Sequence, residues 1–193
     1  MLLIKPSPAV IDEYLKKWDS LDSYVMQESS LKKLFTKTYP LNNDMDEILI
    51  KVCSLNDFYS TNIFSPFKVA MHIRNIEFDK RLKENDLGLV NELANVQVNE
   101  EKKINFYSFA TKYCSHHKPE TYPIFDSYVE KLLLYFKKEY NFSNFRKTDL
   151  KQFIRYREIL EDFRRYFGLD RYNLKEIDKY LWQAGKEYFP RKY

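Results

Sequence analysis

The sequence predicts an all-α fold, a compact multi-helix array, and three observations lead to that prediction. Apolar side chains recur at helical spacing along nearly the whole chain, which is the pattern of amphipathic helices. No pair of strand-like runs is joined by a tight turn, and no internal repeat or low-complexity linker interrupts the pattern. The connections between the helical segments are short, which favours helices packed directly against one another.

The first half of the chain predicts helical segments at residues 11–24, 31–35, 45–55, 67–76 and 87–93. Pro40 ends the second segment, Asn43-Asp44 offers an N-cap for the third, and Ser65-Pro66 begins the fourth. Residues 97–99 are expected to form at most a brief extended piece without a strand partner.

The second half predicts helices at residues 104–116, 125–136, 148–163 and 174–188. Thr148-Asp149 and Asn173 supply the N-caps of the last two helices. Gly168 and Pro190 end those helices, because glycine favours a helix C-terminus and proline cannot continue one.

We expect one structural unit over residues 1–193, with N-terminal helices at 1–42 and a helical core at 43–189. Hydrophobic residues make up 44% of the 193 residues, which is enough material for a core. No apolar run approaches the roughly 20 residues of a membrane span, so no membrane partner is expected. Two cysteines with no evident reason to pair favour a reducing, cytoplasmic location.

Glycine usage excludes one large class of function. Loops that cradle phosphates need several glycines close together, whereas the three glycines here, Gly88, Gly168 and Gly185, are far apart. The sequence therefore disfavours Rossmann and P-loop nucleotide-binding proteins, and we expect no cofactor.

Charge is distributed unevenly along the chain. Residues 1–100 contain 12 Lys or Arg and 15 Asp or Glu, a net charge of −3, whereas residues 101–193 contain 20 and 13, a net charge of +7. A basic half rich in Tyr and Phe suits a polyanion, since cations meet phosphates and aromatic rings stack on bases. A solvated lysine-rich surface would give the same composition, and the charge alone leaves both interpretations open.

The stretch Phe106–Val129 contains the largest concentration of groups that can do chemistry. Pro123 cannot lie inside a helix, so a helix begins just after it and places Asp126 at or near its N-terminus. The unpaired N–H groups and the helix dipole favour a carboxylate there. Asp126 is therefore either a simple cap or an ionised group that acts as a general base or stabilises a developing cation.

Other residues of this stretch allow further chemistry. Cys114 could be a nucleophile beside His116 or His117, and Cys114, His116 and Asp126 could hold a metal. The sequence favours plainer roles, namely a buried thiol and one histidine that caps a helix end while the other packs. Lys112 could be an amine nucleophile only if desolvated, and we expect it on a solvated face.

A polar run, Asn56–Asn62, joins two predicted helices. Its Asn, Tyr, Ser and Thr side chains could line a pocket and bind a base edge or a sugar–phosphate. An ordinary cap that leads into Ser65-Pro66 explains them equally well.

Together these segments resemble the helix-hairpin-helix DNA glycosylase superfamily in an atypical form, over roughly residues 45–189. Residues 48–62 are similar to the early family helix that ends in a polar segment near the DNA. Tyr122-Pro-Ile-Phe-Asp126-Ser-Tyr-Val129 resembles the family ending Pro-x-x-Asp-Thr-His-Val. Residues 178–186 resemble the closing family helix, Asp-x-x-Leu-x-x-x-Gly.

The resemblance implies a monofunctional DNA glycosylase, with DNA as its partner, that removes a damaged or modified base. Asp126 matches the catalytic aspartate, which stabilises an oxocarbenium-like sugar and assists attack by water on a flipped nucleotide. The family hairpin contains a Gly-x-Gly turn. The corresponding residues 100–108 of this chain contain no glycine, and two lysines supply positive charge there instead. Family members with lyase activity have a lysine upstream of the aspartate, and the corresponding residues here are Phe106, Tyr107 and Ser108. The substrate- or DNA-binding residues implied are Lys102, Lys103, Lys112, Asn56, Tyr59, Asn62, Tyr122, Ser127, Tyr128 and Trp182.

Three other functions stay open on the sequence alone. The chain could be a non-catalytic nucleic-acid-binding module, a protein-interaction helical module, or a small-molecule or metal enzyme that uses Cys114 and the two histidines. No specific protein partner is predicted.

Overall fold

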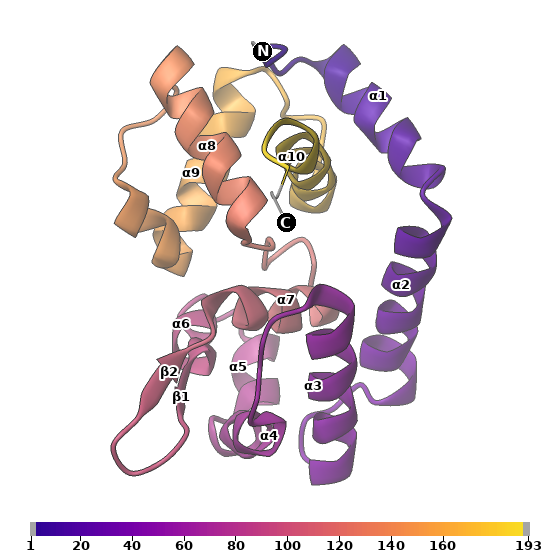
Figure 1. The fold of residues 1–193 in the computed structure, drawn as a ribbon, viewed down its shortest axis with the longest axis vertical. Helices are drawn as coiled ribbons and strands as arrows, with labels where there is room; N and C mark the ends of the chain where they lie inside the picture. The colour runs from indigo at the N-terminus through magenta and orange to yellow at the C-terminus, as the bar shows by residue number, and fades with distance from the viewer. Residues whose placement is uncertain (1–2, 191–193) are drawn as a thin grey trace. The chain divides into compact units, whose positions relative to one another are not determined.

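A computed structural model describes residues 3–190, and it is mostly helical, which confirms the predicted all-α fold (Figure 1). The α-helices are α1 (Pro8–Asp19), α2 (Asp22–Lys33), α3 (Met45–Tyr59), α4 (Pro66–Asn75), α5 (Phe78–Lys83), α6 (Leu89–Ala94), α7 (Tyr107–His117), α8 (Ser127–Tyr140), α9 (Phe153–Tyr166) and α10 (Leu174–Tyr188). The short elements are the π-helix η1 (Leu34–Thr38), the 3-10 helix η2 (Lys147–Lys151) and the strands β1 (Asn95–Gln97) and β2 (Lys103–Asn105).

The chain forms two compact units. Unit 1 combines the residues up to Val25 with those from Pro123 onward, and unit 2 is Met26–Tyr122. The chain passes from one unit to the other within α2 and again at the Tyr122-Pro123 peptide. The N-terminal segment that we expected at residues 1–42 therefore contributes helices to both units.

In unit 1, α10 packs against α1 and α8. An aromatic core joins α8 and α9, with ring centroids 5.6 Å apart for Phe136 and Phe163 and 4.8 Å apart for Phe163 and Phe167. These rings fall at helical spacing in the sequence, so burial of one apolar stripe on each helix brings them together. The face predicted for α8 is buried as expected, and it consists of Val129, Leu132, Leu133 and Phe136.

In unit 2, α7 is the central helix, because α3, α6 and η1 all pack against it. Nine of its 11 residues are buried, so α7 has almost no solvent face. Polar side chains on such a helix must find hydrogen-bond partners inside the protein, because an unpaired buried polar group is costly. The buried polar residues of α7 are Thr111, Lys112, Ser115 and His116.

Several predicted helix ends are confirmed. The Asp44 carboxylate accepts hydrogen bonds from the N–H groups of Asp46 and Glu47 at the start of α3. Asn173 forms a capping box with Glu176 at the start of α10. Gly168 follows α9 with a φ of +65°, a left-handed conformation that glycine adopts without strain.

The prediction of an unpaired extended piece at residues 97–99 is wrong. Strands β1 and β2 form an antiparallel hairpin with Val96 opposite Ile104, a residue that we expected in a helix. The Asn99 side chain closes the turn, since its Oδ1 accepts from the N–H groups of Glu101 (3.1 Å) and Lys102 (2.8 Å). Asn99 therefore stabilises a tight turn of the kind that a glycine usually indicates in a sequence.

Two predicted helices are divided in the structure. The segment 11–24 breaks at Ser20, whose hydroxyl donates to the Lys17 carbonyl at 2.7 Å and so caps α1. The segment 148–163 becomes η2 followed by α9, because Gln152 takes an extended conformation between them. Helix α5 was not predicted, and it begins after Glu77, which has a φ of +50°.

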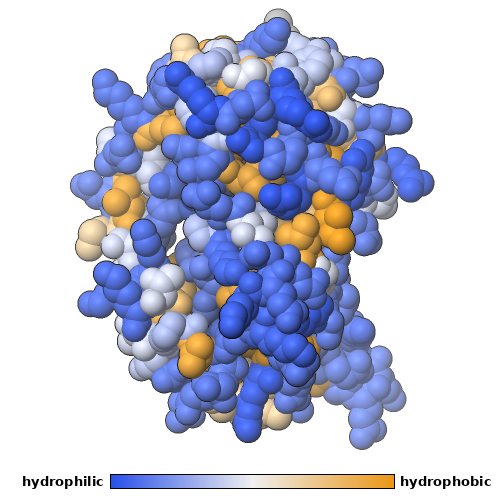
Figure 2. Space-filling model, turned by 180° about the vertical axis from the view of Figure 1, so that it is seen from behind, coloured by the Kyte–Doolittle hydropathy of each residue, from blue (hydrophilic) through white to orange (hydrophobic). Residues whose placement is uncertain are grey.

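One face of the molecule is mostly hydrophilic, with small, separate hydrophobic patches (Figure 2). Within residues 3–190, no helix is both long and apolar enough to cross a bilayer.

Gly185 allows a close approach between α10 and α8. A Cβ at this position would lie 2.8 Å from both the Cβ and the carbonyl oxygen of Tyr128, a distance at which atoms must move. Tyr128 is in the first turn of α8, so the contact fixes the N-terminal end of that helix. The glycine of the closing segment is therefore required by packing.

Gly185→Ala is expected to destabilise the protein by about 1 to 3 kcal/mol, because the backbone of α8 must shift to admit a methyl group. Thermal or urea unfolding would measure the loss. Gly168→Asn is the matched control, since nothing lies within 4 Å of a Cβ there and asparagine tolerates positive φ. Equal unfolding free energies for the two variants would contradict this role of Gly185.

Candidate functional site

Asp126 is the N-cap of α8, as predicted. Its Oδ1 accepts hydrogen bonds from the N–H groups of Tyr128 (2.9 Å) and Val129 (3.0 Å). The residue is half-buried, and among residues 3–190 no group donates a hydrogen bond to its Oδ2. One oxygen therefore fixes the carboxylate, and the helix N-terminus favours its charge, while the second oxygen remains able to act on another molecule.

The segment before Asp126 is held in place by unit 1. The Tyr156 hydroxyl, on α9, donates to the carbonyl oxygen of Ile124 at 2.6 Å. The rings of Phe125 and Tyr156 meet edge to face with centroids 5.5 Å apart. Because Ile124 and Phe125 are buried, the backbone that leads into the cap is fixed by packing as well as by hydrogen bonds.

A second group of reactive side chains lies within unit 2, and we call it the α7 cluster: Tyr59, Ser108, Lys112 and His116. The Lys112 ammonium donates to the Ser108 hydroxyl at 2.6 Å and lies 5.3 Å from the centroid of the Tyr59 ring. The Tyr59 hydroxyl and His116 Nε2 are 3.1 Å apart. The end of α3 and one face of α7 thus bring a cation, a phenol and an imidazole together.

The structure corrects the expectation that Lys112 lies on a solvated face. Only 3% of its surface is exposed, because α7 is surrounded by other helices. The Ser108 hydroxyl and carbonyl and the Tyr59 ring replace the water that an exposed ammonium would have.

A third group surrounds Asn42, and we call it the Asn42 cluster: Asn42, Lys51, Asp79, Tyr113 and His117. The Asn42 amide oxygen accepts from Lys51 Nζ at 2.7 Å and from the Tyr113 hydroxyl at 2.6 Å. Its Nδ2 donates to Asp79 Oδ1 at 2.6 Å and is 3.3 Å from His117 Nε2. Both ends of one buried amide are therefore saturated, which suits a structural role.

Burial makes the Asn42 cluster electrostatically costly. It lowers the pKa of Lys51 to about 8, although Asp79 and Glu47 oppose the shift. Burial, together with the positive charge of Lys51, lowers the pKa of His117 to about 3. His117 is therefore neutral in the folded protein at physiological pH.

Cys114 does not have the properties of a nucleophile. It is a free thiol with no exposed surface, and burial raises its pKa far above the usual range. Within the described part of the chain, no three His, Cys, Asp or Glu side chains come together as metal ligands. Both histidines pack against Phe35 instead. The ring centroid of Phe35 lies 5.3 Å from that of His116 and 5.1 Å from that of His117.

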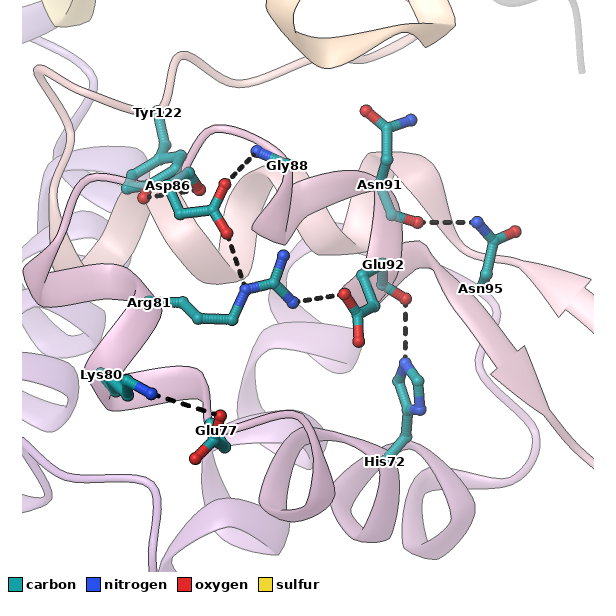
Figure 3. A network of polar contacts seen from close by, with 10 residues as sticks. All are labelled: His72, Glu77, Lys80, Arg81, Asp86, Gly88, Asn91, Glu92, Asn95 and Tyr122. Atoms are coloured by element: carbon teal, nitrogen blue, oxygen red, sulfur yellow. Dashed lines mark hydrogen bonds and ion pairs between the residues drawn. The ribbon is translucent and has the colours of Figure 1, made fainter.

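Tyr122, one of the predicted substrate- or DNA-binding residues, is fully buried at the end of unit 2. Its hydroxyl donates to the Asp86 carbonyl at 3.2 Å, within the network of Figure 3. Arg81 fixes that loop by pairing with the Asp86 carboxylate (2.7 Å) and with Glu92, and the hydrogen bond from Arg81 lowers the pKa of Asp86. Because its ring has no open face, Tyr122 serves as an anchor for the chain rather than as a stacking surface.

The other predicted residues fall in several places. Asn56 fixes the loop that follows α3, and Asn62, in that loop, has a φ of +58° and is exposed. Lys102 and Lys103 are exposed in the β1–β2 hairpin. Trp182 lies in unit 1 against Trp18 and Tyr24, with centroids 5.8 and 4.9 Å away. Ser127 and Tyr128 begin α8 beside Asp126.

Sequence reasoning missed the Asn42 cluster and the roles of Ser108 and His116 in the α7 cluster. One signal was available for Lys51, which falls on the same helical stripe as the buried residues Ile48, Val52 and Leu55. A lysine at a core-facing position must find acceptors inside the protein. No comparable signal marks Asn42.

Comparison with known proteins places this architecture in a family. The family described as "HI_0787_N: N-terminal domain" matches residues 10–121. The chain belongs to this family. A relative from Haemophilus influenzae, named "Uncharacterized protein", is 48% identical over 163 residues, which cover 83% of this chain and 78% of the relative. No solved structure matches the chain.

The HI_0787_N match contains all of unit 2, except its last residue, and therefore both clusters of that unit. It ends before Asp126, which belongs to unit 1. The family boundary and the second passage between the units thus fall almost at the same place in the sequence.

The folded protein is expected to lose stability as pH falls from about 6.5 to about 3. His117 stays neutral in the folded state, whereas its unfolded form takes up a proton near pH 6.5, so acid favours unfolding. The loss from this residue is at most about 5 kcal/mol, from the size of the pKa shift. Urea unfolding across this pH range would measure it.

His117→Gln should flatten that pH dependence, whatever its effect on stability at neutral pH. His72→Gln is the matched control, since His72 is outside the Asn42 cluster and its ring bonds the Glu92 carbonyl. If wild type and His117→Gln lose stability in parallel between pH 6.5 and 3, His117 is not buried as a neutral group.

Proposed function

We propose that the chain is a DNA-binding enzyme that releases a damaged or modified base by hydrolysis of its glycosidic bond. The observation that carries the proposal is the fixed carboxylate of Asp126, with one oxygen held by the α8 N-terminus and the other without a donor among residues 3–190. The expected likeness to the helix-hairpin-helix glycosylases supplies the reaction class.

Asp126 has the properties that the hydrolysis needs. Breaking the bond between a base and its sugar leaves positive charge on the sugar ring, and a nearby carboxylate stabilises that charge. The same oxygen can orient a water molecule and accept its proton as the new C–O bond forms. The two N–H donors hold the carboxylate in one orientation, so little reorganisation is needed when the charge develops.

Lys112 favours hydrolysis over lyase chemistry. A lysine must be a neutral amine to attack the sugar carbon. Here its nitrogen is buried, donates to two oxygens of Ser108 and faces the Tyr59 ring, so it is held inside unit 2 and is not presented to a sugar carbon. We therefore assign Lys112 to holding the end of α3 against α7, through Tyr59 and Ser108.

The DNA contacts of this proposal rest on charge. The basic second half of the chain, residues 101–193, carries a net charge of +7, whereas residues 1–100 carry −3. In the β1–β2 hairpin, Glu100 and Glu101 stand beside Lys102 and Lys103, so the tip is neutral overall and contributes less to phosphate binding than a glycine hairpin would. We place the activity in the cytoplasm, where the free thiols Cys53 and Cys114 would stay reduced.

Asp126→Asn is expected to reduce base release by about 100-fold or more, because an amide cannot accept the proton of water or balance a developing cation. Asparagine is also a good N-cap, so the variant should keep its fold and its affinity for DNA. Single-turnover release from duplexes that carry modified bases, with anisotropy for binding, would measure both quantities.

Asp44→Asn is the matched control, as it makes the same change at the N-cap of α3, outside the predicted site. Binding by all three proteins should weaken steeply as salt concentration rises, because phosphate contacts release counterions. Unchanged release by Asp126→Asn would refute the catalytic assignment. DNA binding with no release by wild type would instead favour a non-catalytic nucleic-acid-binding module.

A further inference from the structure

Three aromatic side chains meet in unit 1, and we call them the tryptophan cluster: Trp18, Tyr24 and Trp182. The ring of Trp182 meets those of Trp18 and Tyr24 edge to face. All three side chains are half-buried, so none of them is sealed in the core. Tyrosine and tryptophan are enriched at interfaces, because one large ring can both pack and contact a partner. The cluster is therefore a candidate binding surface.

The local fold fixes the positions of these rings. Trp18 is in the last turn of α1 and Tyr24 is in the first turn of α2, on the two sides of the break between these helices. Helix α10 packs against α1 and supplies Trp182. The adjacent Gln183 is buried and donates from Nε2 to the Tyr14 carbonyl at 2.9 Å, which holds α10 against α1. The rings are thus arranged before any partner binds.

Two lysines of α10 place their charge on the faces of the same rings. The Lys179 ammonium lies 4.8 Å from the centroid of the Trp18 ring. The Lys186 ammonium lies 4.7 Å from the centroid of Tyr24 and 5.0 Å from that of Trp182, and it donates to the Tyr24 hydroxyl. A cation is attracted to the face of an aromatic ring, so the rings hold these ammonium groups in place.

Lys186 is not neutralised by a carboxylate. Between residues 3 and 190, no acidic side chain forms an ion pair with it. Its neighbour Glu187 pairs instead with Lys17 at 2.9 Å. The Lys186 side chain is exposed, so an incoming anion can reach it, and an ammonium binds a phosphate through charge-assisted hydrogen bonds.

The tryptophan cluster lies on the helix that supports the proposed catalytic carboxylate. Gly185, next to Lys186 on α10, is packed so closely against Tyr128 that a Cβ there would lie 2.8 Å from the Tyr128 Cβ. Tyr128 is in the first turn of α8, and its N–H donates to Asp126. All of these residues belong to unit 1, so their arrangement is set within one packed unit.

We propose that the tryptophan cluster, with Lys179 and Lys186, binds unpaired nucleotides of a nucleic-acid strand. This inference rests on the proposed function, which makes nucleic acid the partner. A phosphate takes the Lys186 ammonium, and a base stacks on the ring surface that the ammonium covers in the free protein. Bases inside a duplex already have both faces covered by their neighbours. An unpaired segment is therefore the form of nucleic acid that fits this surface.

Intrinsic tryptophan fluorescence tests the proposal directly, because the chain contains two tryptophans and both are in the cluster. Titration with a single-stranded oligothymidylate should quench this emission and saturate. A duplex of the same length should bind more weakly at the cluster and quench less. Anisotropy with labelled copies of both probes measures the two affinities independently of the tryptophans.

Two variants separate stacking from charge. Tyr24→Leu keeps both tryptophans and should weaken single-strand binding by about tenfold, the loss of one stacking contact. Lys186→Gln should lower the slope of log affinity against log salt concentration by about 0.7, the loss of one phosphate contact. Lys138→Gln is the matched control, because it removes an exposed lysine of unit 1 on α8, outside the cluster, and should leave the slope unchanged.

The outcomes distinguish this inference from the proposed function. If wild type binds the single strand with unchanged tryptophan emission, or if Lys186→Gln and Lys138→Gln behave alike, the cluster is not the binding surface and the proposed function stands. Equal affinity and equal quenching by the duplex would exclude a preference for unpaired nucleotides. Equal quenching by a polyglutamate peptide would show a surface for acidic polypeptides and overturn the inference. If wild type binds neither probe, the proposed function and the inference fall together.

Discussion

The buried ammonium of Lys51 is the constraint on which unit 2 depends. It has no exposed surface, and it donates to Asn42 Oδ1 and to two backbone carbonyls of the loop before α3. A buried cation that lost these acceptors would cost several kcal/mol, so the loop must keep this shape. Asn42 in turn connects this loop to α5 through Asp79 and to α7 through Tyr113 and His117.

Because α7 is held through Tyr113 and His117, the groups on its neighbouring face are also held. The α7 cluster is built on the same helix, and Lys112 and His116 can meet Tyr59 only if α7 and α3 keep their register. The hydrogen bonds that Lys51 requires when it is buried therefore also help to hold the reactive side chains in place. Replacement of a buried charged group by an apolar one often stabilises a protein, so a polar centre of this kind suggests a requirement for one specific geometry.

Where the chain passes from unit 2 to unit 1, each end of the connection is bound within its own unit. The Tyr122 hydroxyl is bound to the Asp86 carbonyl in unit 2, and the Ile124 carbonyl accepts from Tyr156 in unit 1. Only Phe125 separates Ile124 from the Asp126 cap. Within unit 1, the position of the proposed catalytic carboxylate is therefore set by the Ile124 anchor, with α10 supporting α8 through Gly185.

Local features of the structure could be predicted from sequence, and features that depend on tertiary contacts could not. The caps at Asp44, Asp126 and Asn173 were predictable because a short polar side chain followed by an apolar-periodic run has one favourable arrangement. The β-hairpin was missed because Asn99 closes its turn without glycine. The burial of Lys112 was missed because a lysine's environment depends on which helices surround it.

Release of a free base is the central claim, and mass spectrometry tests it most directly. Wild-type protein would be incubated with duplexes that carry a panel of damaged and modified bases, and the soluble fraction would be analysed for free bases. Wild type should release at least one base, and Asp126→Asn should release none above background. Absence of any released base, with folded protein that binds the same duplexes, would contradict the account.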